Sequence, residues 1–174
     1  MQDIADRSET SKSALHYHYD TKHDLLLAFL DHLYDSFEER FATDPDADPL
    51  DRLAAVVAEA LDEADDEERR DLRTAMLEIR AQAPYDDAFR DHLDKFDEYI
   101  AAEVREIVAD GVEAGVFRDD TDPEALAEFV VTVFDGAHVR SISTGRLLSA
   151  TREHLAEYVE RDLLADADRE VEFS

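Results

Sequence analysis

Apolar residues recur at steps of three and four along most of this chain, which is the spacing that one face of an α-helix requires. The first clear stripe predicts a helix over residues 22–42, and its members are Leu26, Phe29, Leu30, Leu33, Phe37 and Phe41. The segment 44–49 contains two prolines and three aspartates, so it should end that helix. No stretch alternates apolar and polar residues as a half-buried strand would, and the pattern therefore predicts an all-α fold.

Three further helices are predicted before residue 115. The stripes of the first two are Leu50, Leu53, Val57 and Leu61, and then Leu72, Met76, Leu77 and Ile79, which end before Pro84. A longer helix over residues 87–114 has one apolar face, formed by Phe89, Leu93, Phe96, Ile100, Val104, Ile107 and Val108. Gly115 stands where a left-handed residue would cap this long helix.

The next predicted helix differs from the others because apolar residues surround most of it. Asp122 and Pro123 form an N-cap and a first-turn proline that start it, and a final helix over residues 149–165 follows. A helix that is apolar on two sides lies in the middle of a bundle or faces a second subunit. Its place beside the last helix favours a symmetric homodimer. The predicted interface consists of Phe129, Val130, Val133, Leu155, Tyr158 and Val159.

The composition adds a strong acidic charge to this helical pattern. The 174 residues include 46 Asp and Glu against 18 Lys and Arg, for a formal net charge of -28. The hydrophobic share of 44% is normal, so the chain should fold as one domain, or as a small module of a larger protein, with an acidic surface. Only three of the basic residues are lysines, a composition similar to that of proteins from salt-loving microbes. The alternative is a mesophilic protein that binds a basic partner.

Several protein classes are excluded by what the sequence lacks. The chain has no cysteine, which rules out disulfides, thiolate metal sites and cysteine nucleophiles. The first fifteen residues lack the basic and then apolar pattern of a secretory signal, and apolar runs such as residues 25–30 are too short to span a membrane. We therefore expect a cytoplasmic protein without membrane contact.

Residues 4–19 have the spacing of a helix-turn-helix, which is two short helices joined by a tight turn. Ile4, Ala5 and Leu15 are its core positions, and Ser11 is a suitable N-cap for the second helix. The residues free to project outward, where such a helix would enter the DNA major groove, are Lys12, Ser13, His16 and Tyr17.

The charge distribution supports a DNA-binding role for this segment. Residues 1–23 contain three basic and four acidic side chains, so they sum to -1 while the other 151 residues carry -27. A surface that meets phosphate cannot be covered with carboxylates, and this is the one region of the chain that is not.

These N-terminal residues resemble the signature of TetR-type transcriptional repressors. The resemblance is carried by Ile4-Ala5, Ser11-Lys12-Ser13-Ala14-Leu15, His16-Tyr17-His18-Tyr19, and Lys22 followed by Asp24-Leu25-Leu26. The segments 115–118, 122–124 and 135–137 also look like the family's entry into its dimerisation helices. The resemblance implies a partial helix-turn-helix domain over residues 1–23 and a larger antiparallel helical domain for ligand binding and dimerisation over residues 24–174.

The resemblance also implies roles for individual residues. Lys22 would bind a phosphate at the start of the following helix, and His16 would touch the DNA backbone. Lys12, Ser13 and Tyr17 would face phosphates or base edges. The partners would be a palindromic double-stranded operator, a second copy of the chain and a small-molecule effector.

The effector would bind between the middle helices of a TetR-like protein. The candidate ligand-binding residues are Met76, Phe96, Tyr99, Ile100, Phe134 and His138, which offer aromatic walls and a few polar tips. The alternative is that these side chains simply fill the core. Tyr99 and His138 are the candidates for polar contacts.

Three departures from the family pattern affect the expected DNA binding. His16 and Tyr19 replace a Tyr and a Phe, and Glu9 replaces the turn glycine, at a cost of about 1 kcal/mol if that position needs a positive φ. Family members also have a whole helix ahead of Ile4. We therefore expect Met1 to be an internal methionine of a longer natural protein, and the chain as given to bind DNA weakly.

Other chemistry finds little support in the sequence. His16, His18 and His23 could bind a metal, but the same His-x-His lies inside the family motif. None of the seven histidines follows a Glu by three residues, as a helical di-metal site requires, and no catalytic motif or phosphate-binding glycine loop is present. We expect no enzymatic activity, no metal and no cofactor. The competing interpretation is an acidic helical dimer that serves as a binding or scaffold protein without a DNA role.

Overall fold

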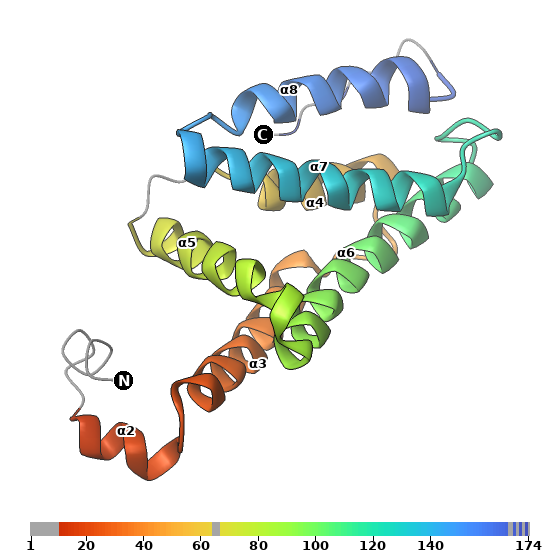
Figure 1. Ribbon diagram of the computed structural model, residues 1–174. Helices are drawn as coiled ribbons and strands as arrows, with labels where there is room; N and C mark the ends of the chain where they lie inside the picture. Colours follow the sequence, from red (N-terminus) through yellow and green to blue (C-terminus); the bar gives the residue numbers. More distant parts are fainter. Residues whose placement is uncertain (1–10, 64–66, 167–168, 170, 172, 174) are drawn as a thin grey trace.

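The computed structural model describes residues 11–63, 67–166, 169, 171 and 173, and the described part is helical (Figure 1). Its helices are α2 (Lys12–His18), α3 (Lys22–Phe41), α4 (Pro49–Ala60), α5 (Glu67–Gln82), the 3₁₀ turn η1 (Ala83–Tyr85), α6 (Asp87–Glu113), α7 (Pro123–Thr144), α8 (Ser149–Tyr158) and the π-helical turn η2 (Val159–Leu163). Within the described residues the one extended pairing is a bridge between Phe117 and Leu164. The predicted all-α fold is confirmed, and no described helix is long and apolar enough to cross a bilayer.

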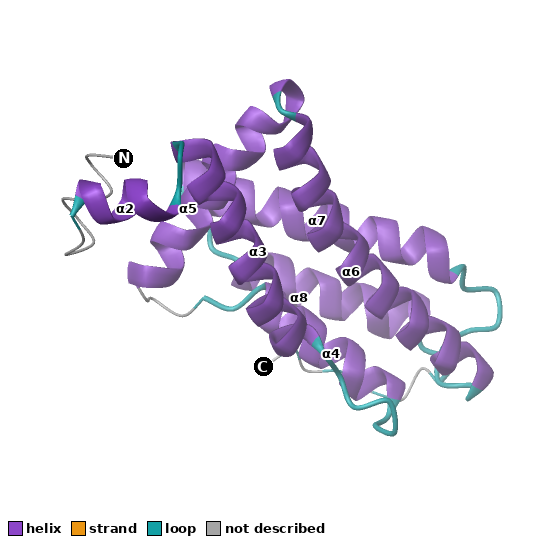
Figure 2. Ribbon diagram, turned by 90° about the horizontal axis from the view of Figure 1, so that it is seen from below, coloured by secondary structure: helices purple, strands orange, loops and turns teal. Residues whose placement is uncertain are grey.

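The long helix α6 is the centre of the arrangement. It packs against α3, α4, α5 and α7, while α8 lies along the side of the molecule opposite α2. Helix α2 stands apart at one end, and α3 connects it with the bundle (Figures 1 and 2). The predicted core positions Ile4 and Ala5 and the turn residue Glu9 lie outside the described residues.

The helix ends follow the capping residues that the sequence shows. Asp122 starts α7 because its Oδ1 accepts hydrogen bonds from the N–H groups of Glu124 (3.0 Å) and Ala125 (3.2 Å). Gly115 ends α6 with a φ of 71°, and the N–H of Val116 donates to Gly111 O at 2.8 Å. This left-handed cap is the one that the sequence predicts.

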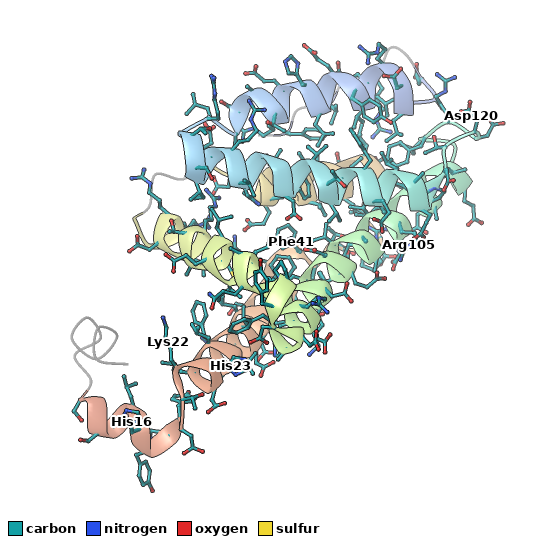
Figure 3. All side chains as sticks on the ribbon, in the orientation of Figure 1. His16, Lys22, His23, Phe41, Arg105 and Asp120 are labelled. Carbon is teal, nitrogen blue, oxygen red and sulfur yellow. The ribbon has the colours of Figure 1, made fainter. Side chains whose placement is uncertain are left out.

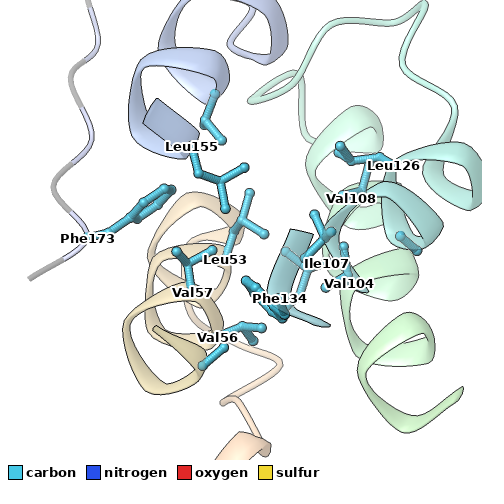
Figure 4. Close-up of a cluster of buried hydrophobic side chains, with 14 of the residues drawn as sticks. Leu53, Val56, Val57, Val104, Ile107, Val108, Leu126, Phe134, Leu155 and Phe173 are labelled. Carbon is cyan, nitrogen blue, oxygen red and sulfur yellow. The ribbon is translucent and has the colours of Figure 1, made fainter. Parts of the chain in front are cut away.

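Buried apolar side chains form two clusters. The larger cluster joins α4, α6, α7 and α8 (Figure 4), and its labelled members are Leu53, Val56, Val57, Val104, Ile107, Val108, Leu126, Phe134, Leu155 and Phe173. The smaller cluster joins α3, α5, η1 and α6 through Leu30, Ile79, Ala83, Phe89, Leu93 and Phe96. Phe37 of α3 packs against both clusters, so the two meet beside this residue.

The last helix differs from the regular helix predicted over residues 149–165. After Tyr158 the chain widens into η2, where the N–H of Leu164 donates to Val159 O at 3.0 Å. The carbonyl of Leu163 then accepts the N–H of Arg118 at 2.9 Å. In a continuing α-helix this carbonyl would accept an N–H group from the next turn. Here it pairs with the segment after α6, and the helix ends at this point.

Candidate functional site

Helix α2 presents its polar side chains to solvent at one end of the molecule. The hydroxyl of Ser11 caps α2 by accepting the N–H of Ala14 at 3.1 Å. The side chain of Tyr17 is 85% exposed and its ring meets the ring of His18 edge-on, with centroids 5.0 Å apart. The predicted DNA-contacting residues Ser13, His16, Tyr17 and Lys22 are all exposed, whereas the side chain of Lys12 lies outside the described residues. His16 and Lys22 lie at the same end of the molecule, opposite Asp120 (Figure 3).

At the start of α3, two backbone N–H groups have no hydrogen-bond partner among the described residues. Thr21 and Asp24 form a capping box, in which Thr21 Oγ1 accepts the N–H of Asp24 (3.1 Å) and Asp24 Oδ2 accepts the N–H of Thr21 (3.0 Å). Of the four N–H groups that a helix start cannot pair internally, those of Lys22 and His23 remain. These two groups and the ammonium of Lys22 form a local positive site, suited to an anion such as a phosphate.

A cavity of about 230 Å³ lies between α3, α4, α5, α6 and α7. Five of the six predicted ligand-binding residues line it, namely Met76, Phe96, Ile100, Phe134 and His138. Tyr99 does not line it. Its hydroxyl donates to Glu38 O at 3.1 Å, and its ring packs on Tyr34 and Phe37, so this side chain ties α6 to α3 instead.

The C-terminal half of α3 forms one wall of the cavity through Leu33, Phe37, Arg40 and Phe41. Three partly buried residues of α5, Leu72, Met76 and Leu77, form another. The apolar stripe of α5 therefore lines a hollow, and only Ile79 of that predicted stripe is fully buried.

Four arginines also line the cavity, and none of them was predicted from the sequence. Arg80 of α5 connects the two neighbouring helices, because its guanidinium lies 3.0 Å from Asp97 Oδ1 of α6 and 2.7 Å from Asp135 Oδ2 of α7. The other three are Arg40, Arg69 and Arg73. A signal was present, since Arg69, Arg73 and Arg80 are four and seven residues apart and so share one face of a helix with Met76.

Burial shifts the pKa values of two groups on the cavity wall. Desolvation lowers the pKa of His138, and the hydrogen bond with Ala60 O opposes this only in part. Because a carbonyl can only accept, His138 Nε2, 2.8 Å from that oxygen, carries the proton in the neutral ring. Desolvation also raises the pKa of Asp135 against the attraction of Arg80.

The predicted dimer interface divides into two groups. Phe129 of α7 is 44% exposed, and its ring centroid lies 5.5 Å from that of Tyr158 of α8; Val133 is half-buried. These three residues are open to a partner. Val130, Leu155 and Val159 are instead buried in the larger cluster of the single chain, so the interface prediction is corrected for these three residues.

The three N-terminal histidines that could suggest a metal site do not form one with their neighbours. Among the described residues no group of three or more histidines and carboxylates is placed to hold a metal ion. His23 Nε2 instead lies 2.9 Å from Asp86 Oδ2, and its ring packs against the ring of Phe89 at an angle of 42°.

Comparison with known proteins identifies relatives of this chain. A family model described as the C-terminal domain of BetI-type transcriptional repressors matches residues 49–168. A TetR transcription regulator from Haloarcula marismortui is 38% identical, with a TM-score of 0.82, over 93% of this chain and 86% of that one. That organism is a haloarchaeon, in agreement with the acidic and lysine-poor composition.

Two other solved structures are similar in fold. A protein from Saccharomonospora viridis, solved in complex with choline, is 26% identical with a TM-score of 0.70, over 94% of this chain and 85% of that one. The reduced form of NemR from E. coli is 16% identical with a TM-score of 0.76, over 96% and 87%. No curated protein matches the chain. Because the family model covers more than half of the chain and the haloarchaeal relative matches nearly all of it, the chain belongs to the TetR family of transcriptional regulators.

Proposed function

We propose that this chain is a homodimeric repressor that binds a palindromic operator through α2 and the start of α3, and that a small effector in the cavity weakens this binding. The observation that carries the proposal is the course of α3. Its first residue is Lys22, at the exposed end beside α2, and its last two turns line the cavity through Phe37, Arg40 and Phe41. One continuous helix of 20 residues, about 30 Å long, therefore belongs to both sites.

The DNA contacts follow from the exposed polar groups of α2 and α3. Lys22, together with the open N–H groups of the first turn of α3, would bind a phosphate. Ser13, His16 and Tyr17 would meet phosphates or base edges, and Lys12 would add a charge at the start of α2. Because the operator would be chromosomal DNA inside the cell, we also propose a cytoplasmic location.

The effector would act through α3. A ligand that prefers a different position of Phe37 and Phe41 stabilises a different tilt of the helix, and a rigid helix carries that tilt to Lys22 and α2. In a dimer, this changes the separation of the two recognition helices and lowers operator affinity by linkage. The choline complex of the relative from Saccharomonospora viridis supports a small-molecule effector for this fold.

The homodimer would form on the outer face of α7 and α8 around Phe129, Val133 and Tyr158, where a two-fold axis would bring the same patch from both chains together. Replacing Phe129 with Asp places a charge in that patch, so sedimentation should show monomers. If the Phe129→Asp variant sediments as the parent does, this interface is wrong.

DNA binding is tested by fluorescence anisotropy with DNA from upstream of the protein's own gene, over a range of salt. Lys22→Gln should weaken binding and reduce the slope of log affinity against log salt by about 1, because one lysine neutralises one phosphate. Lys95→Gln is the matched control, because Lys95 is an exposed lysine that belongs to α6 and to neither α2 nor α3. If the parent binds no DNA at any salt, the competing scaffold interpretation is favoured.

A further inference from the structure

Four arginines line the cavity, and three of them form ion pairs with carboxylates among the described residues. Arg40 pairs with Glu59, with Nε 2.6 Å from Oε1, and Arg69 pairs with Asp62. Arg80 holds both Asp97 and Asp135. In a chain with 46 acidic residues, four of the 15 arginines line this one hollow.

Arg73 is the one of these four arginines that forms no ion pair with a carboxylate of the described residues. Its Nη2 donates to the backbone carbonyl of Asp62 at 2.7 Å, and among the described residues no carboxylate lies within ion-pair distance of its guanidinium. Burial lowers the pKa of Arg73. The charge of Asp62, which already pairs with Arg69, and that of Glu59, which pairs with Arg40, oppose this effect, whereas the charges of Arg69 and Arg40 add to it. A guanidinium has five N–H donors in a fixed fork, so most of its donor capacity remains for a bound anion.

The rest of the wall is apolar and the space is small. Leu72, Met76, Phe96, Ile100 and Phe134 surround the volume. About 230 Å³ exceeds the roughly 150 Å³ of a cavity that holds benzene, so it accommodates one ring or a short chain with a small polar head. A quaternary ammonium ion would fit the aromatic walls, but the acidic side chains on the wall that could neutralise it, Glu59, Asp97 and Asp135, are already bound to arginines.

We infer that the cavity binds a small amphipathic carboxylate, with its anionic head on the guanidinium of Arg73 and a single ring or short aliphatic chain against the apolar wall. This inference rests on the proposed function, in which the cavity is the effector site. It adds the chemical class of the effector and the residue that selects it.

The test is isothermal titration calorimetry with three probes at one salt concentration: benzoate, its neutral isostere benzamide, and choline. Benzoate should bind, and benzamide should bind roughly tenfold more weakly, because only the carboxylate forms charge-assisted hydrogen bonds. Choline should bind more weakly than benzoate.

Variants of α5 test whether Arg73 is the residue that binds the carboxylate of benzoate. Arg73→Gln should lose roughly tenfold in benzoate affinity with little change for benzamide, and Arg73→Lys should recover part of the loss. Arg70→Gln is the matched control, because it removes the same charge from an exposed position of the same helix that does not line the cavity. Circular dichroism checks that each variant is folded.

Three results would overturn the inference: choline that binds as tightly as benzoate, benzoate affinity that is equal in the parent and Arg73→Gln, or no benzoate binding at millimolar concentration. The DNA anisotropy assay separates these results from the proposed function. If benzoate binds through Arg73 but the protein binds no DNA, the proposed repressor function is wrong and the anion site stands. If choline releases the operator and benzoate does not, the anion site is wrong and the repressor function stands.

Discussion

The imidazole Nε2 of His23 lies 2.9 Å from Oδ2 of Asp86, which joins the first turn of α3 to the residue that caps α6. The other carboxylate oxygen of Asp86 accepts the N–H of Phe89 at 3.2 Å, and the ring of Phe89 lies 4.9 Å from the ring of His23. The end of α3 that carries Lys22 is therefore held against the start of α6 through a polar and an aromatic contact. This contact is where movement of α6 would reach the proposed DNA-binding surface.

Replacing Asp86 should separate its two roles. Asp86→Asn keeps an N-cap of nearly equal strength but removes the charge facing His23, so stability should change little. The first turn of α3 should nevertheless exchange its amide hydrogens faster, because the link to α6 is weakened. Asp86→Ala should in addition cost about 1 kcal/mol through removal of the cap. Hydrogen exchange measured on peptides from α3 tests this, and unchanged protection in Asp86→Asn would show that the link does not hold the first turn in place.

Replacing Gly111 and Gly136 with alanine should change the stability of the protein in opposite directions. A Cβ on Gly111 would overlap the ring of Phe117, which is buried, so Gly111→Ala should destabilise the protein by about 1–3 kcal/mol despite its better helix propensity. Gly136 of α7 has open space around it, so Gly136→Ala should stabilise by up to about 1 kcal/mol. Thermal unfolding of both variants at one salt concentration checks the pair, and a stabilised Gly111→Ala would contradict the close packing of Phe117.

A buried arginine should contribute more to the stability of the protein than an exposed one. The side chain of Arg52 is 2% exposed, and its donors reach Thr43 Oγ1 (3.0 Å), Asp110 Oδ2 (2.6 Å) and Glu106 Oε1 (3.4 Å). Arg52→Met should cost about 2 kcal/mol, since it removes these bonds while the two carboxylates, which are 46% and 62% exposed, return to water.

Arg118→Met is the control for Arg52, because Arg118 pairs with Asp120 at the surface (3.3 Å) and its removal should cost less than about 1 kcal/mol. Denaturant unfolding at equal salt gives both values. Equal destabilisation of the two variants would mean that the Arg52 network adds nothing beyond a surface pair.

His138 should make stability depend on pH in a defined direction. Burial holds its pKa below the ordinary value of 6.5, so the unfolded chain binds the proton first as the pH falls. Its contribution is fully present above pH 6.5 and is lost as the pH falls from there towards the folded-state pKa. Relative to His138→Gln, the parent should therefore lose free energy of unfolding between about pH 8 and about pH 5. His154→Gln, at an exposed histidine, is the control, and a parent-to-His138→Gln difference that stays constant with pH would refute the assignment.

The helix starts and ends that depend on local chemistry could be predicted from the sequence. Ser11, Asp122 with Pro123, and Gly115 act on backbone groups within a few residues of themselves, so their effect does not depend on the rest of the fold. Five of the six ligand-binding residues predicted from the sequence also line the cavity, because aromatic and polar side chains on helices of known order face the same interior.

Other features depended on which helices meet. Tyr99 was a candidate for a polar ligand contact, but its hydroxyl donates a hydrogen bond to Glu38 O of α3, and its side chain does not line the cavity. The sequence pattern of Val130 and Val159 predicts interface residues, but both side chains are buried in the core of the single chain. Similarly, the π-helical end of α8 depends on pairing with a segment more than forty residues earlier.

The sequence by itself determined an acidic, all-α chain with a nearly neutral N-terminal segment, because helical periodicity, caps and charge counts are local properties. Only the tertiary structure decided that Arg40, Arg69 and Arg80 have carboxylate partners while Arg73 meets none within the described part of the chain. The reason is physical: an ion pair depends on distances of a few ångströms between side chains on different segments, and these distances exist only once the helices have packed.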